Sequence, residues 1–324
     1  MKRLFPLLLL ATLALAGCMQ PNVSLFGNPG APFQEVTLDG KGQDKILLVP
    51  IDGLISEASR QSFLATKPSV VQEVAAQLKI AKRDKAIKAV LLKVDSPGGT
   101  VTASDVIHHE LTEYKKASGA KVVAALMGVA ASGGYYVALP ADRIVAHPTT
   151  ITGSVGVIFV MPRVAGLLDK IGVGVDVSKS GSLKDMGSPF RPATEEERKL
   201  TDAMTAAQAA RFQDLVRASR KLAPEAMAQV ATARVFTAQE AKDLGLVDSV
   251  GYLEDAVKAA RELAGLPADA RVVTYRRSPQ SHTTWYARSA EAQGGPAALV
   301  NVDLGALAPP KAGMYFLWEP GYTE

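Results

Sequence analysis

The sequence predicts an α/β protein in which a parallel β-sheet is wrapped by helices. From residue 45 onward, short apolar runs alternate with amphipathic stretches, which is the pattern of strand–helix–strand units. The apolar runs lack the polar alternation of a half-exposed strand and are typical of strands buried on both faces. With 324 residues, 48% hydrophobic and 21% charged, the chain can also bury a full core.

Each expected strand is a short, β-branched apolar run; these are Ile46–Ile51, Ala89–Val94, Val122–Leu126, Arg143–Ala146, Val155–Val160, Val173–Val177 and Arg271–Tyr275. Each expected helix carries apolar residues at helical spacing; these are Val70–Lys82, Ala103–Ala117, Gly133–Leu139, Glu195–Leu222, Ala238–Leu244 and Leu253–Leu263. The helix at 238 has a Thr cap before it and a glycine after it, which are ordinary start and stop signals.

The amino terminus has the composition of a secretory signal. Lys2 and Arg3 precede the apolar stretch Leu4–Ala16, and small residues then lead to Cys18. Because Cys18 is the only cysteine and stands where bacterial lipoprotein signals are modified, lipid attachment is favoured over a disulfide. An uncleaved membrane anchor is the weaker alternative, since the apolar stretch is shorter than the ~20 residues that span a bilayer. We expect an extracytoplasmic or periplasmic protein anchored to the membrane through Cys18.

The remaining boundaries follow from composition. Residues 1–17 form the signal, and residues 18–44, rich in Gly, Pro and Asn, form a tether. Residues 45–265 form the main domain. Residues 266–324 form a C-terminal tail that beyond 278 shows no period, and we expect a flexible tail or an arm that orders on a neighbouring subunit. The net charge of +4, lower still once the signal is removed, argues against a nucleic-acid partner.

Ser132 is the leading candidate for a nucleophile. Small residues precede it and two glycines follow it, which gives the space that a tight turn around a reactive hydroxyl needs. Its base is harder to assign. The four histidines, His108, His109, His147 and His282, lie in patterns that do not favour the role, and His147 is kept as a reserve.

Lys184 is the alternative base, because a lysine can accept a proton once burial lowers its pKa. It lies in a polar loop after Val173–Val177. Asp185 would raise the lysine pKa if the two side chains faced each other, so we expect Asp185 to point away. Arg191 either steadies this loop, contacts substrate, or is an ordinary surface arginine.

The glycine pair that follows the strand Ala89–Val94 fits an oxyanion hole. Backbone amides exposed just after a buried strand can face the oxygen of a reacting carbonyl group. Taken alone, this segment also matches an ordinary strand-to-helix turn, and Ser132 and Lys184 taken alone match a close-packed helix start and a solvated lysine.

The joint occurrence of four motifs favours the catalytic interpretation over these ordinary ones. The motifs, in chain order, are Asp95–Gly99, Ala130–Tyr136, Thr152–Gly156 and Ser182–Asp185. Their order closely resembles bacterial signal peptide peptidase A in its short, single-repeat form, over roughly residues 45–265. The resemblance implies the spiral fold shared with caseinolytic protease and crotonases. It also implies a Ser-Lys dyad of Ser132 as nucleophile and Lys184 as general base. Ser154 would hydrogen-bond the lysine, and Gly99 with Gly133 would form the oxyanion hole.

The same resemblance predicts a homo-oligomer whose subunits together complete the active site. We therefore expect a serine endopeptidase that cleaves remnant signal peptides, binds extended apolar substrates by strand addition and needs no cofactor. No metal-binding spacing is present in the sequence. Two alternatives stay open, a crotonase-like acyl-CoA enzyme and a noncatalytic lipid-anchored scaffold. Tyr135 and Tyr136 are expected to pack beside the site rather than take part in the chemistry.

Overall fold

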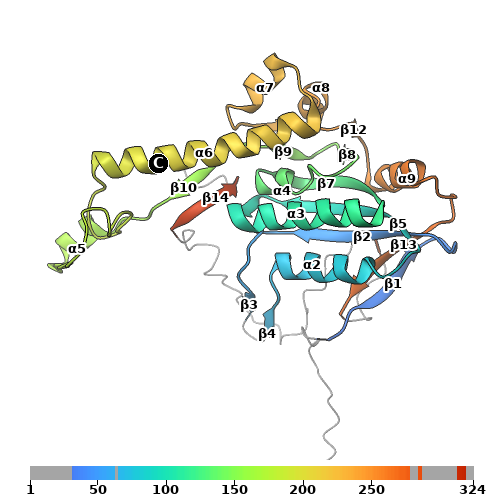
Figure 1. Cartoon of the computed structure of the whole chain (residues 1–324), viewed down its shortest axis with the longest axis horizontal. Helices are drawn as coiled ribbons and strands as arrows, with labels where there is room; N and C mark the ends of the chain where they lie inside the picture. The colour runs from blue at the N-terminus through green and yellow to red at the C-terminus, as the bar shows by residue number, and fades with distance from the viewer. Residues whose placement is uncertain (1–30, 63–64, 278–283, 287–311, 319–324) are drawn as a thin grey trace, which may run out of the picture.

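A computed structural model of the chain describes residues 31–62, 65–277, 284–286 and 312–318 (Figure 1). The predicted signal, Cys18 and the first part of the predicted tether lie outside these residues, as does His282. No helix in the described ranges is both long enough and apolar enough to cross a bilayer.

The large sheet is mostly parallel, with strand order β1-β13-β2-β5-β7-β8-β12. Its parallel strands are β13 (Arg271–Arg276), β2 (Lys45–Asp52), β5 (Ile87–Ser96), β7 (Lys121–Ala131), β8 (Arg143–Ala146) and β12 (Ser249–Val250). The edge strand β1 (Gln34–Asp39) pairs antiparallel with β13, so the sheet includes part of the predicted tether and part of the predicted tail. The predicted α/β class with a mainly parallel sheet is confirmed.

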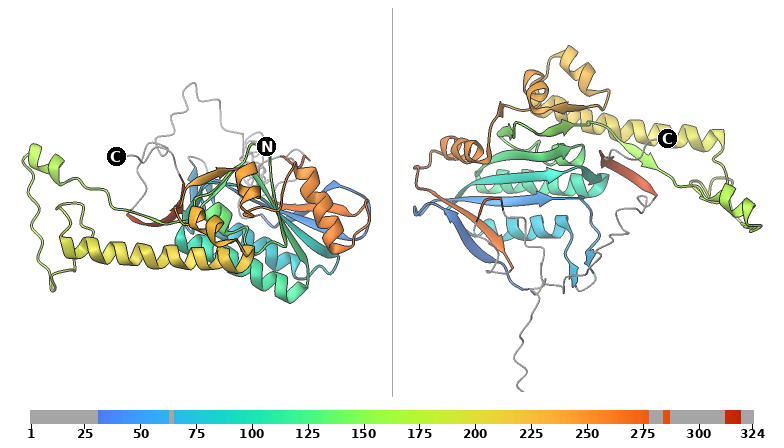
Figure 2. Two further views of the ribbon diagram at one scale, coloured as in Figure 1. Left: turned by 90° about the horizontal axis from the view of Figure 1, so that it is seen from above. Right: turned by 180° about the vertical axis from the view of Figure 1, so that it is seen from behind.

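Helices lie on both faces of this sheet, as the view from above in Figure 2 shows. Leu47 and Val49 of β2 pack in one core with α2 (Val70–Ala81) and α3 (Val101–Ser118). Ile46 and Leu48 point to the opposite face and pack in a second core with α9 (Leu253–Ala264). Successive side chains of a strand alternate between faces, so an unbroken apolar run supplies both cores.

Shorter elements complete the body of the molecule. They are β3 (Arg60–Ser62), β4 (Ala65–Lys67), β6 (Gly98–Thr100), α4 (Gly133–Tyr136), β9 (Ile151–Gly153), α7 (Pro224–Val230), β11 (Val235–Thr237), α8 (Ala238–Asp243) and β14 (Gly313–Leu317). β9 continues beside the end of β7, where it also pairs with β11. β14 lies between β6 and β10 (Ile158–Val160) in a small antiparallel sheet.

An arm formed by residues 161–204 projects from this body. It contains α5 (Ala165–Lys170), a segment without regular structure and the first part of α6 (Glu195–Arg220). Both views in Figure 2 place α5 at the outer end of the arm, whereas the last part of α6 returns to the body and buries Phe212 and Val216. Exposed apolar side chains are concentrated on the arm; they are Leu167, Ile171, Val173, Val175, Val177, Met186, Phe190, Leu200 and Met204.

Most predicted elements are confirmed to within a few residues at each end, and Arg143–Ala146 is matched in full. The strand expected at Val173–Val177 is wrong, because these residues lie exposed in the arm and pair with no strand of the described part of the chain. Only the end of the strand expected at Val155–Val160 is found, as β10. β14 falls in the predicted tail, and it pairs with strands of its own chain.

Candidate active site

Ser132 stands at the carboxyl end of β7, immediately before α4. Its backbone is strained, with φ 53° and ψ −116°, a region that residues other than glycine rarely occupy. The side chain is 1% exposed, and its Oγ has no hydrogen-bond partner among the described residues. A buried hydroxyl left unpaired costs about 1–3 kcal/mol. Strain and an unpaired hydroxyl at one residue are features that stability alone does not favour, and they are common at functional sites.

β9 brings Ser154 beside Ser132. Ala131 at the end of β7 is in register with Gly153, and the Ser132 backbone N–H donates a 2.8 Å hydrogen bond to the Gly153 carbonyl oxygen. Ser154 is the next residue, is 8% exposed, and also has a positive φ of 51°. Its N–H donates to the carbonyl oxygen of Arg234. The two serines predicted for the site therefore follow paired strand ends.

Gly98, which was not predicted for the site, and Gly99, which was predicted for the oxyanion hole, both lie against other backbone segments. Gly98 has φ 107°, and a Cβ there would come within 1.9 Å of the Phe316 carbonyl oxygen and 2.7 Å of the Gly133 backbone nitrogen. A Cβ at Gly99 would lie 1.8 Å from the Ile55 carbonyl oxygen. Only glycine fits at either position. Gly98 and Gly133 thus approach each other next to Ser132, and Gly99 follows Gly98 in β6 with Ile55 beside it.

β14 lies against Gly98 and Gly133 in an extended conformation, as a bound peptide would. Phe316 is in register with Gly99, Leu317 with Gly98, and on the other side Tyr315 with Ile158 of β10. The Phe316 carbonyl oxygen faces the backbone of Gly98 and Gly133. This strand was not predicted from the sequence, although the short apolar run before Trp318 is a signal that could have indicated it.

The ring of Phe316 fills an aromatic pocket. It stacks on Tyr136 with 4.9 Å between ring centroids and lies 4.9 Å from Phe212. Tyr135 and Tyr136 are both fully buried, which confirms their packing role. The Tyr136 hydroxyl donates to Asp105 (2.6 Å), and burial raises the pKa of this phenol. The space beside β6 and α4 is therefore lined by aromatic rings and filled by Phe316.

Lys184 lies elsewhere in the chain. It is exposed, in a turn between α5 and α6, and that segment belongs to the outer part of the arm, apart from α4 in Figures 1 and 2. Within the described residues its ammonium has no hydrogen-bond or ion-pair partner. Asp185 does point away as expected, because its carboxylate is bound by Lys179 and Arg191. A single chain does not bring Lys184 to Ser132.

The histidines offer no base within the described residues. The half-buried ring of His108 packs edge-on against Tyr136, and burial lowers its pKa. His147 shares a hydrogen bond with Thr149 and packs on Tyr252. Neither is hydrogen-bonded to the Ser132 Oγ. The described part of the chain also contains no cluster of three or more His, Cys, Asp or Glu side chains able to hold a metal ion.

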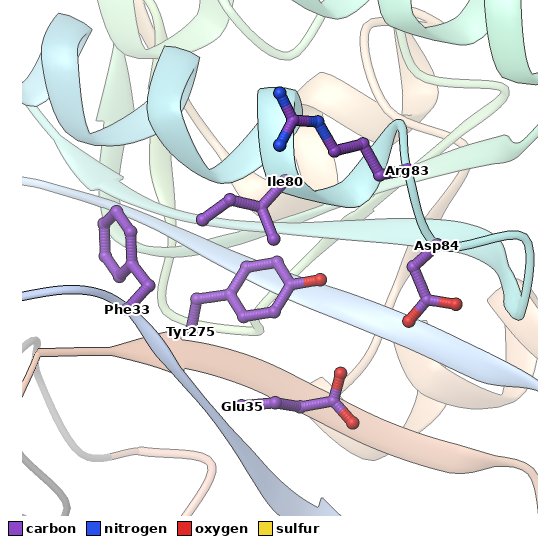
Figure 3. A pocket seen from close by; sticks show the side chains of 6 residues that line it. All are labelled: Phe33, Glu35, Ile80, Arg83, Asp84 and Tyr275. Atoms are coloured by element: carbon purple, nitrogen blue, oxygen red, sulfur yellow. The ribbon is translucent and has the colours of Figure 1, made fainter.

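Figure 3 shows a hollow of about 460 Å³ between β1, α2 and β13, outside the Ser132 site. Glu35 and Asp84 point into it, and both accept a 2.8 Å hydrogen bond from the Lys45 ammonium. These ion pairs lower the pKa of Asp84 against the opposing effect of burial. Because its carboxylates are already paired, the hollow does not contain the groups that hydrolysis would need.

Comparison with known proteins agrees with this geometry. The family model "Peptidase family S49" matches residues 114–267, and "Clp protease" matches residues 56–151. A putative signal peptide peptidase SppA of Enterococcus faecium is 35% identical over 79% of this chain and 73% of its own length. A putative protease of Synechocystis is 37% identical over 74% of this chain and 79% of its own.

The chain belongs to peptidase family S49. It is therefore a serine protease, and the predicted relationship to signal peptide peptidase A is confirmed. Protease 4 of Salmonella typhi is 41% identical over 59% of this chain, a match that covers 31% of that longer S49 relative. A solved ClpP1 variant from Listeria monocytogenes aligns with 65% of this chain and 94% of its own at 19% identity and a TM-score of 0.42. Membership in a serine protease family disfavours the crotonase-like alternative.

Proposed function

We propose that this protein is a membrane-associated serine endopeptidase in which Ser132 is the nucleophile and Lys184 of a neighbouring copy is the general base. The observation that carries the proposal is the buried Ser132 Oγ, which has no partner among the described residues and lies beside the backbone of Gly98 and Gly133. Ser132 would attack a peptide carbonyl group, and glycine amides would stabilise the oxyanion.

The location of the arm explains why a second copy is needed. Lys184 is exposed at a distance from Ser132 in its own chain, so within one copy it cannot take the proton of the serine hydroxyl. Contact with another copy would cover the apolar side chains of the arm and desolvate the lysine, which lowers an amine pKa. Ser154 would then orient the amine, since its hydroxyl can both donate and accept. A homo-oligomer follows from this proposal.

The substrate is an extended apolar peptide. The space between β6 and β10 accepts a strand, as β14 demonstrates, and the aromatic pocket of Tyr136 and Phe212 accepts a large apolar side chain. Remnant signal peptides have this composition, and a relative carries the name signal peptide peptidase. Lipid attachment at Cys18 would hold the enzyme at the membrane where such peptides remain, outside the cytoplasm. No cofactor is required by this chemistry.

Mixed oligomers test the proposal. Ser132→Ala and Lys184→Ala should each abolish labelling by a fluorophosphonate probe, whereas Lys170→Ala, which removes another exposed lysine of the arm, should not. When the two inactive variants are mixed and allowed to reassemble, labelling should return, because a Ser132 site can then meet an intact Lys184. Labelling of Lys184→Ala on its own would refute the dyad. No labelling of the intact protein at any pH would favour the scaffold alternative.

A further inference from the structure

Arg191 connects the turn that carries Lys184 to the start of α6. Its Nε and Nη2 donate to the two carboxylate oxygens of Asp185, at 2.8 Å and 2.7 Å. Its Nη1 donates to Glu197 at 2.9 Å, and Nη2 contacts the other oxygen of the same carboxylate. One guanidinium therefore binds both acids, each through two nitrogens.

The two acids are fixed by further contacts. Glu197 is 2% exposed and accepts a 2.8 Å hydrogen bond from the backbone N–H of Thr194, completing the capping box of α6. Asp185 accepts a second ion pair from Lys179 at 2.8 Å. A capped helix end is a rigid support. The contacts of Arg191 therefore fix the orientation of the turn that carries Lys184 relative to α6.

We infer that Arg191 is a positioning residue for Lys184: it fastens the turn 182–187 to α6 and keeps the Asp185 carboxylate away from the lysine amine. The inference deepens the proposed function and rests on it, since it assumes that Lys184 is the base. A lone surface arginine or a simple ion pair would not link Asp185 in the turn to Glu197 in α6 in this way.

The charges around the turn affect how readily the Lys184 amine can lose its proton. The charged groups around the turn are Lys179 before it, Asp185 within it, and Arg191 and Glu197 after it, which together are neutral. Hydrogen bonds from Arg191 and then Lys179 hold the Asp185 pKa well below its usual range, so this carboxylate stays ionised and paired. Without Arg191, Asp185 would keep only Lys179 and Glu197 would lose its ion pair, so the group would carry one net negative charge. That charge near Lys184 would favour the protonated form of the amine.

The rate at which a fluorophosphonate probe labels Ser132, measured across pH on the assembled full-length protein, tests the inference. In Arg191→Gln the midpoint of the rise in rate should move up by on the order of one pH unit, with about tenfold slower labelling below the midpoint. Adding Asp185→Asn to that variant should return the midpoint toward the wild-type value. Such a return would not occur if Arg191 only stabilised the fold.

An unchanged midpoint in Arg191→Gln would overturn the inference, even if the rate or melting temperature fell. Should that variant not fold, Arg191→Lys decides, because a lysine keeps the charge but cannot bind both carboxylates through paired nitrogens. It should show a smaller upward shift of the midpoint, and a wild-type profile would count against the inference. Lys184→Ala distinguishes failure of the proposed dyad from failure of the proposed role of Arg191. If Lys184→Ala is still labelled, the dyad is refuted. If Lys184→Ala is inactive and Arg191→Gln has a wild-type pH profile, only the role of Arg191 is rejected.

Discussion

The backbone N–H of Ser132 donates a hydrogen bond to the carbonyl oxygen of Gly153. This contact extends the β7–β9 pairing by one residue past Ala131, and it fixes the serine turn against the strand end that carries Ser154. Parallel strand ends are where α/β folds place their sites, because loops and helix starts from several strands meet there. The nucleophile and the residue proposed to orient its base are thus aligned by main-chain pairing, before any side-chain contact is made.

Relief of strain at Ser132 should be measurable as stability. Ser132→Gly removes the penalty of φ 53° and the unpaired buried hydroxyl, whereas Ser132→Ala removes only the hydroxyl. We expect the glycine variant to be more stable than the alanine variant by about 1 kcal/mol, as measured by denaturant unfolding. Both variants should be inactive, so activity does not confound the comparison. An alanine variant of equal or greater stability would show that the turn is not strained.

Close backbone approach should make Gly99 intolerant of any side chain. In Gly99→Ala the new Cβ would meet the Ile55 carbonyl oxygen, so this part of the site must shift, at a cost of about 3 kcal/mol or more in the free energy of unfolding. Gly166→Ala is the matched control, because a Cβ there meets nothing within 4 Å, and it should be neutral or stabilising by up to about 1 kcal/mol. Equal effects of the two changes would contradict the proposed packing at Gly99.

Removal of β14 should open the peptide groove. A chain that ends at residue 311 lacks the strand that pairs with β6 and β10 and loses the Phe316 ring from the pocket of Tyr136 and Phe212. We expect faster probe labelling of Ser132 than in the full chain, and a synthetic peptide covering residues 312–318 should slow it again. Slower labelling of the truncated chain, together with no effect of the peptide, would show that β14 completes the site instead of occupying it.

The ion pairs of Arg191 with Asp185 and Glu197 should make the free energy of unfolding fall in acid. Hydrogen bonds from Arg191 and the Thr194 N–H lower the Glu197 pKa to about 2, from 4.5 without these contacts. A carboxyl group with a lowered folded-state pKa stabilises the fold above its unfolded-state pKa, and this contribution is lost as the pH falls from 4.5 toward 2.

Thermal melts of wild type and Glu197→Gln across this range measure the effect. The glutamine variant should be less stable at neutral pH and should lose less stability on acidification. Parallel melting curves for the two proteins at all pH values would contradict the assignment.

The sequence was a good guide wherever a signal is local. β5 and β8 are recognisable because an unbroken β-branched run has few alternatives to a buried strand. Local patterns misled at Val173–Val177, where an apolar run without a neighbouring strand stays irregular in the arm. The short apolar run of β14 was not enough to predict it, because so short a strand depends on its pairing with β6 and β10.

The sequence by itself determined the alternation of strands and helices and the expected packing of the tyrosines, because both rest on residue type and spacing along the chain. It also offered Ser132 and Lys184 as candidates, and the resemblance of its four motifs to a known family added Ser154 and Gly99. Tertiary structure decided which of these meet. It placed Ser154 and the glycines at Ser132 through strand pairing, filled the groove with β14, and left Lys184 exposed on the arm. Proximity of residues distant in sequence depends on how whole strands pair and pack, and no local pattern encodes it.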